Sequence, residues 1–257
     1  MMPRLLALVA CLAALGCATP YAKLDGVLSD VRPTPQPASQ GVTIIHGGQS
    51  RTGAPQQSVL KGDTMRTLPG GVAILTLRPG YELIVEPGSE ISIENPSIFV
   101  TVGKLFLKKL KAAREALRLN TKFVSAGVEG TQFVFEVTRD DVVRLTVLEG
   151  FVWLRSRTTG WTAVTYRAGE SVTIRDGEPP GRIQQVDPAS MRAIQERSLA
   201  IERAAGYRTG QPWSRFTPLF KKPIFFIPAA VVGAAVGVIL VTQGGDSQGT
   251  VTIHIPF

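Results

Sequence analysis

Glycine and proline turns that recur between short β-branched runs are the feature that most constrains this sequence. Pro-Gly pairs begin at residues 69, 79 and 87, and the runs between and after them, at 72–77, 83–85 and 91–93, are rich in Val, Ile and Leu. Proline presets the first central position of a type II turn, and glycine supplies the positive φ that the second position requires. Short strands at this regular spacing predict an all-β sandwich, barrel or short solenoid.

The second half of this region alternates apolar and polar residues with a period of two. Such alternation is typical of an antiparallel sheet with one buried and one solvated face. We therefore expect a mainly β domain over residues 42–175, a layered antiparallel sandwich or a short solenoid. The alternating apolar positions are Phe133, Phe135, Val137, Val143, Leu145, Val147, Val152 and Leu154.

The N-terminus has the pattern of an export signal. Residues 1–4 are short and basic, and residues 5–15 are apolar but too few to span a bilayer. The sequence ALGC, ending at Cys17, resembles a bacterial lipobox, in which the cysteine is lipidated, although Ala14 departs from the usual leucine. Lipidation at Cys17, at Cys11 after a shorter apolar run, ordinary signal-peptidase cleavage and an uncleaved anchor all stay open.

The positions of the cysteines limit how the rest of the chain can be stabilised. The only two cysteines, Cys11 and Cys17, lie in the signal segment, so the folded part has no disulfide and no cysteine-based metal site. Its stability must come from an apolar core.

The segments that flank the β domain have different textures. Residues 18–41 are proline-rich without apolar periodicity, which indicates a tether. Residues 187–206 predict a helix, with Asp187 as N-cap, Pro188 at the first helical position and Gly206 at the end. A polar linker is expected over residues 207–222.

The C-terminal region carries a second membrane signal. Residues 224–242 contain no charge, and as a helix they would extend about 28 Å, close to the thickness of a bilayer core. Gly233 and Gly237 have the small-xxx-small spacing that lets two helices approach closely. A single-span anchor is expected, with a buried apolar hairpin and an oligomerisation stalk as alternatives. Residues 243–257 are expected to be a flexible tail.

Three short elements of the β region resemble the FecR family domain over roughly residues 60–175. The family pattern has a V-x-G-T-x-F element, a V-x-E-G-x-V element and a closing A-G-E/Q, in this order. Here they read VEGTQF (128–133), VLEGFV (147–152) and AGE (168–170). The resemblance implies an extracytoplasmic β domain that serves as an interaction or sensory module.

The best-known members of that family relay the occupancy of an outer-membrane transporter to a cytoplasmic sigma factor through an N-terminal anti-sigma segment. This chain departs from that plan, because an export signal starts at residue 1 and the apolar span follows the domain. Sigma-factor regulation is therefore not carried over.

The glycines of the FecR elements have a physical explanation in the sequence itself. Gly130, Gly150 and Gly169 each allow a tight turn or bulge that a Cβ would obstruct. Thr131 and Glu149 can bond exposed amides at the turns, and Phe133 re-enters the core. We expect these elements to be matching corners of a layered β structure. Corners for folding alone and a ligand site at the turns both stay open.

The search for catalytic residues is nearly empty. The two histidines, His46 and His254, lie at opposite ends, and no metalloprotease, nucleophile-elbow or phosphate-loop spacing occurs. His46 precedes a glycine turn, which favours a hydrogen-bonded or solvated histidine. No enzyme activity, cofactor or metal is expected.

A basic run between residues 104 and 122 is the strongest charge feature of a chain whose net charge is +8. It is interpreted as a solvated hairpin tip or as a patch for anionic lipid, lipopolysaccharide or an acidic protein partner. It lacks the interleaved aromatics of a nucleic-acid groove, and export argues against nucleic acid. Its basic residues are Lys104, Lys108, Lys109, Lys111, Arg114, Arg118 and Lys122.

Together these features predict a non-enzymatic, membrane-attached protein of the bacterial envelope whose periplasmic FecR-like domain is a binding or signalling module. The alternative is a structural scaffold that oligomerises through the Gly-xxx-Gly helix of residues 224–242.

Overall fold

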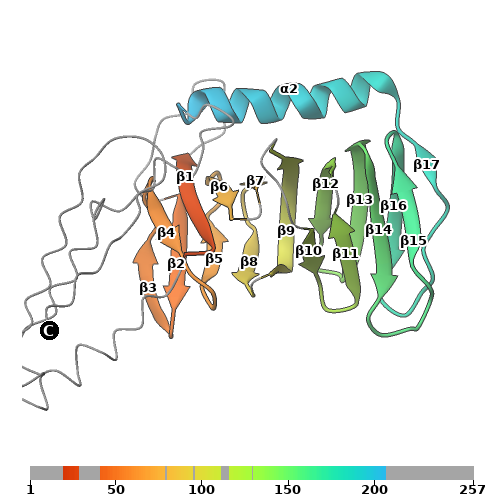
Figure 1. Cartoon of the computed structure of the whole chain (residues 1–257), viewed down its shortest axis with the longest axis horizontal. Helices are drawn as coiled ribbons and strands as arrows, with labels where there is room; N and C mark the ends of the chain where they lie inside the picture. The colour runs from red at the N-terminus through yellow and green to blue at the C-terminus, as the bar shows by residue number, and fades with distance from the viewer. Residues whose placement is uncertain are drawn as a thin grey trace, which may run out of the picture. The chain divides into compact units, whose positions relative to one another are not determined.

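A computed structural model describes residues 20–28, 41–78, 80–94, 96–110, 116–128 and 130–206 of the chain. The chain divides into two compact units, Met1–Trp213 and Ser214–Phe257, and every described residue belongs to the first. In the described ranges that unit is mainly β, with one helix (Figure 1). The predicted fold class is confirmed to this extent.

The strands form two open layers. The first layer, sheet A, has the order β4-β1-β6-β7-β9-β12-β13-β16-β17, and the second, sheet B, has the order β3-β2-β5-β8-β9-β10-β11-β14-β15. The strands of sheet A are β1 (Ala22–Leu28), β4 (Gln57–Val59), β6 (Val72–Leu77), β7 (Tyr81–Val85), β12 (Gln132–Val137), β13 (Val142–Glu149), β16 (Glu170–Arg175) and β17 (Gln184–Gln185). Those of sheet B are β2 (Val42–His46), β3 (Gln49–Thr52), β5 (Thr64–Thr67), β8 (Glu90–Ile93), β10 (Leu117–Asn120), β11 (Val124–Val128), β14 (Phe151–Ser156) and β15 (Val164–Arg167).

The long strand β9 (Ser97–Lys109) belongs to both sheets. Its first half pairs with β8 and β10 in sheet B, and its second half, from Gly103 onward, pairs with β7 and β12 in sheet A. Gly103 has a φ of +123°, and a Cβ there would lie 2.1 Å from the hydroxyl oxygen of Ser89. A glycine is therefore required where the strand passes from one sheet to the other.

The chain alternates between the two sheets in a regular order. Strands β6 and β7 lie in sheet A, β10 and β11 in sheet B, β12 and β13 in sheet A, and β14 and β15 in sheet B. The changes of sheet from β11 to β12, from β13 to β14 and from β15 to β16 are short corners. All pairings of the described strands are antiparallel except that of β9 with β10, which is parallel.

The main core lies between the two sheets and takes every second residue of most strands. On β12, Phe133, Phe135 and Val137 point into it, while Val134 points to the opposite face of sheet A. The alternation in the sequence thus gives the correct inward face.

The helix α2 (Pro188–Ala204) begins and ends at the expected residues. The Ser190 amide donates to the Asp187 carboxylate at 2.9 Å, and hydrogen bonds from the Ser190 hydroxyl and amide lower the pKa of that carboxyl. Ala205 caps the C-terminus, and Gly206 follows with a φ of +64°. The cap and the proline explain why the helix starts where it does.

The prediction of a tether over residues 18–41 is wrong for part of that segment. Residues Ala22–Leu28 form β1, a buried strand between β4 and β6. Leu24 faces the core between the sheets and Leu28 faces α2, so both faces of β1 are covered. A strand buried on both faces needs no polar alternation, which is why the sequence pattern concealed it.

The compact body also extends beyond residue 175, because β17 pairs with β16 and α2 covers sheet A. No helix in the described ranges is long and apolar enough to cross a bilayer. The predicted span at 224–242 and the linker and tail around it lie outside those ranges.

Candidate functional site

Helix α2 covers the outer face of sheet A. It lies across the strands (Figure 1). Its inner side packs on a second apolar cluster that is separate from the main core. On the helix, Ile201 is buried in this cluster and Met191, Ile194 and Ala204 pack against it. The sheet contributes Leu28, Val72, Ile74, Ile84, Phe106, Val134 and Leu148.

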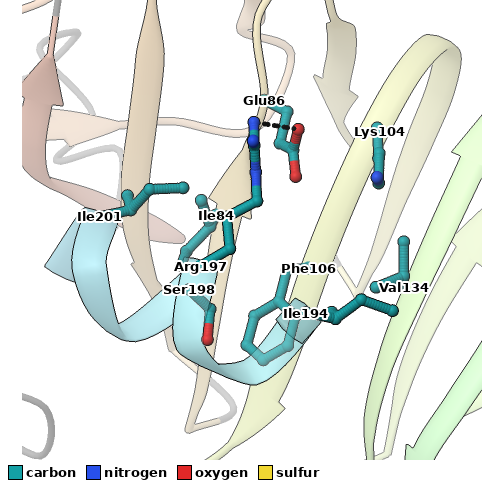
Figure 2. A pocket seen from close by; sticks show the side chains of 9 residues that line it. All are labelled: Ile84, Glu86, Lys104, Phe106, Val134, Ile194, Arg197, Ser198 and Ile201. Atoms are coloured by element: carbon teal, nitrogen blue, oxygen red, sulfur yellow. Dashed lines mark hydrogen bonds and ion pairs between the residues drawn. The ribbon is translucent and has the colours of Figure 1, made fainter. Parts of the chain in front are cut away.

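A small crevice lies between α2 and the sheet at this interface. Figure 2 shows its apolar side chains from both elements, including Phe106 and Val134 of the sheet and Ile194 of the helix. Arg197 of α2 donates to the Glu86 carboxylate at 3.1 Å on one side. The interface therefore combines an apolar floor with a charged rim.

Lys104 of β9 also lines this crevice (Figure 2). In the part of the chain that the structure describes, its ammonium has no hydrogen bond or ion pair, whereas its backbone amide donates to the Ser89 hydroxyl. With a cavity volume of about 20 Å³, the crevice has room for about one water molecule.

Polar side chains under the C-terminal half of α2 interrupt the apolar interface. The Lys108 ammonium lies 3.3 Å from the Glu202 carboxylate, and both side chains are mostly buried. Glu82, fully buried, is the cross-strand neighbour of Lys108. On the next strands Lys23 pairs with Asp25 at 3.2 Å, and the Thr76 hydroxyl donates to Asp25 at 2.5 Å. Because buried charges are costly without their partners, this row favours one position of the helix on the sheet.

The FecR elements lie at successive corners along one edge of the two layers. Gly130 and Thr131 connect β11 to β12, Gly150 connects β13 to β14, and Gly169 connects β15 to β16. The three glycines have φ angles of +77°, +76° and +85°. Left-handed backbone at every corner explains why the elements contain glycine.

Backbone hydrogen bonds join each of these corners to a neighbouring segment. The Lys109 amide donates to the Thr131 carbonyl at 3.2 Å, and the Ala168 amide donates to the Gly150 carbonyl at 3.0 Å. The Val186 amide donates to the Gly169 carbonyl at 2.8 Å. Val186 immediately precedes Asp187, the N-cap of α2. Two of these bonds therefore link the Gly150 and Gly169 corners to the segment that leads into α2.

The remaining residues of these elements occupy different environments. Phe133 is fully buried, and Glu149 is exposed. The Thr131 hydroxyl is buried and has no hydrogen-bond partner among the described residues, of which Glu129 is not one. The geometry at the three corners is that of chain reversal, and the described side chains add no set of convergent polar groups to it.

The described members of the basic run do not form one surface. Lys104 and Lys108 face α2, Lys109 lies over the Gly130 corner, and Arg118 is exposed on the outer face of sheet B. Lys122 pairs with Asp141 at 3.0 Å and Asp176 at 3.8 Å, which raises its pKa. The run is not a hairpin tip either, because β9 continues to Lys109 and β10 pairs parallel to it.

Several predicted site residues lie outside the described ranges. These are the lipidation candidate Cys17, the patch residues Lys111 and Arg114, and the helix-packing glycines Gly233 and Gly237.

The sequence analysis missed a buried carboxylate beside His46. Asp63 is fully buried, and its carboxylate lies 2.5 Å from His46 Nδ1, accepts from the Leu60 amide at 2.9 Å and lies 3.3 Å from Arg51. His46 is thus the hydrogen-bonded turn histidine that was expected. Asp63 holds together the turn before β5, and a lone Gly-Asp pair in the sequence gives no signal of that role. In the described ranges no three potential ligands cluster around a metal position.

Comparison with known proteins finds a family match for one segment of the two β layers. Residues 63–153 match the FecR family, described as FecR protein. The matched segment runs from the turn before β5 to the middle of β14, so it contains the bent strand β9 and two of the three glycine corners. The chain therefore contains a FecR domain, as its sequence elements indicated.

Two solved structures are similar to this chain at low identity. Both are crystal structures of a "putative anti-sigma factor" from Parabacteroides distasonis, each 13% identical with a TM-score of 0.43. The first alignment covers 51% of this chain and 64% of the other, less than two thirds of its length; the second covers 56% and 74%. None of the curated proteins matches this chain.

Proposed function

We propose that the chain is a non-enzymatic binding and signalling protein of the bacterial envelope, in which the FecR domain receives a partner and α2 relays that event. The observation that carries the proposal is the docking of α2 on sheet A. The helix lies outside the matched segment 63–153 but covers the outer face of that segment's strands. The crevice and its charged rim are features of an interface that two elements can leave and re-form.

The contacts of α2 support a relay more than a purely structural role. Only three of its side chains, Ser198, Ile201 and Glu202, are buried, and Leu199 is 41% exposed. A helix held by a narrow apolar strip and a few ion pairs lies at the low end of local stability, where switching elements are found. The chain continues from α2 toward the apolar segment of residues 224–242.

Membrane attachment is part of the proposal. The export signal and Cys17 would anchor the chain from its N-terminus, and residues 224–242 would span a membrane. Mass spectrometry of the mature N-terminus tests the first anchor, with a diacylated Cys17 as the expected species. Protection of the tail beyond residue 243 from added protease in spheroplasts tests the second, and full digestion of that tail would contradict it.

The relay is tested by undocking the helix. Ile201→Glu places a charge in the apolar cluster under α2, whereas Ile183→Glu changes a residue that is 49% exposed and serves as the control. Hydrogen exchange should show loss of protection over residues 188–204 in the first variant only, with the β core still protected.

Transcript levels are then compared between the parent strain, a deletion strain and strains that carry each variant. We expect the genes whose expression changes on deletion to change also with Ile201→Glu and not with Ile183→Glu. If α2 is undocked and the transcripts stay as in the parent strain, the relay is wrong. If deletion itself alters no transcript, the signalling function is wrong.

A further inference from the structure

We propose that the outer face of sheet B, on the side of the domain away from α2, binds an acidic polysaccharide on a platform centred on Trp153. The inference goes beyond the proposed function, because it concerns a separate surface and does not require α2 to move.

The platform is built from a tryptophan that lies flat on a glycine. Gly127 of β11 and Trp153 of β14 are register partners, and a Cβ on Gly127 would lie 1.8–2.3 Å from three atoms of the indole ring. The ring therefore covers the backbone of β11 where no side chain projects, and Trp153 remains partly exposed. A flat indole presents a face of negative electrostatic potential, to which the C–H groups of a sugar ring are attracted.

Three arginines surround this ring on the same face. Arg118 of β10 is the register partner of Gly127 on its other side, so it lies beyond the indole at about 10 Å from the β14 backbone. Arg155 follows Trp153 by two residues on the same strand, and Arg167 of β15 is opposite Phe151. Side chains two apart on a strand share a face, so the three arginines project from the same face of sheet B as the ring.

These cations are available to a ligand. Arg118, Arg155 and Arg167 are all exposed, and none has an acidic partner within ion-pair distance in the ranges that the structure describes. The carboxylates at the margin are engaged elsewhere: Glu94 accepts from Ser97 and Asn120, and Glu170 accepts from the Arg167 amide. Guanidinium groups bind carboxylates in a bidentate geometry, which matches the charged group of a uronic acid.

The combination selects a polymer that is both acidic and saccharidic. An acidic peptide would use the arginines but not the exposed indole face. A single-stranded nucleic acid would use both, and Phe151, which is 43% exposed two residues before Trp153, adds a second aromatic side chain to this face. The choice against nucleic acid therefore rests on the predicted export signal, which would place the domain outside the cytoplasm.

The experiment measures binding of alginate oligomers, which are made of uronic acids, to the full chain by tryptophan fluorescence and calorimetry. Dextran oligomers of matched length, polyglutamate and an oligothymidylate are the comparison probes. We expect alginate to bind, with affinity falling as salt rises, and the three comparison probes to bind at least about tenfold more weakly.

Variants locate the site. Trp153→Ala should weaken alginate binding about tenfold, Trp153→Phe less, and Arg155→Gln severalfold, since each removes a stacking or ionic contact. Arg139→Gln, at an exposed turn of sheet A, is the matched control and should bind as the parent does. Thermal unfolding checks that each variant is folded.

The other outcomes overturn the proposal in distinguishable ways. Equal binding of polyglutamate points to an acidic protein partner, and stronger binding of oligothymidylate points to nucleic acid. No binding of any probe leaves Trp153 with the purely structural role of covering Gly127. Alginate binding that survives Trp153→Ala in a folded protein places the site elsewhere.

Discussion

The corner at Gly150 packs directly on the corner at Gly130. A Cβ at position 150 would lie 2.9 Å from the Gly130 carbonyl oxygen and 2.8 Å from the Thr131 methyl carbon. The two similar turns, twenty residues apart in the sequence, are therefore neighbours in space. Position 150 needs glycine for two reasons, the left-handed φ and the closeness of the adjacent corner.

Gly150→Ala should therefore destabilise the domain more than an alanine substitution at a left-handed glycine that has no close neighbours. We expect a loss of about 3 kcal/mol in the free energy of unfolding, from strain at positive φ together with the clash at the neighbouring corner. Gly177→Ala is the control, because Gly177 has a φ of +80° and no heavy atom within 4 Å of its would-be Cβ. That variant should lose about 1 kcal/mol. Equal losses in denaturant unfolding would show that the corners do not depend on each other.

Gly103→Ala tests the strand that belongs to both sheets. A Cβ at this position would lie 2.2 Å from Ser89 Cβ and 2.5 Å from Ser89 Cα, so relief requires movement of the backbone. We expect a loss of more than about 3 kcal/mol, with near-ultraviolet circular dichroism reporting altered packing of the core. Gly88→Ala, at φ +72° in open space, is the matched control. A Gly103 variant that is as stable as the Gly88 variant would mean that β9 can bend elsewhere.

Lys108→Met tests the polar row under α2. The substitution removes the ammonium group that lies 3.3 Å from the mostly buried carboxylate of Glu202, at an expected loss of about 3 kcal/mol near neutral pH. Lys122→Met, which breaks an exposed pair with Asp141, should change stability little. A loss no larger than that of Lys122→Met would contradict the buried-charge explanation.

Tyr166 gives the domain a stability term at alkaline pH. Burial, and then the nearby Glu170 carboxylate, raise the pKa of this phenol to about 12, above its ordinary value of 10.0. A pKa that is raised in the folded state adds stability that is complete below pH about 10 and is lost as pH rises toward 12. The parent should therefore lose up to about 2 kcal/mol more than Tyr166→Phe over that range. Denaturant unfolding at both ends of the range checks this, and parallel losses in the two proteins would place the phenolate in solvent.

Local patterns were sufficient for the parts of the fold in which the cause is local. A positive φ at Gly130, Gly150 and Gly169, the N-cap at Asp187 and the inward face of β12 all follow from one residue and its near neighbours. Such features depend on backbone sterics and on side-chain period, which the sequence shows directly.

The sequence pattern was insufficient where burial comes from distant strands. Residues Ala22–Leu28 look like a tether because their pattern is not periodic, and they form a strand only because β4, β6 and α2 surround them. The basic run looks continuous in the sequence, but β9 and β10 turn its members to different faces. Asp63 has no sequence signal for its contacts with His46 and Arg51.

By itself, then, the order of amino acids determined that this protein is built of short strands with glycine corners, that one capped helix follows them and that a FecR domain is present. Only the tertiary structure decided that the corners stack, that α2 covers one sheet and that Trp153 lies on Gly127 among three arginines. The physical reason is the sequence distance between the interacting residues. Turns and caps depend on neighbours along the chain, whereas the composition of a surface depends on which strands, distant in sequence, pair with each other.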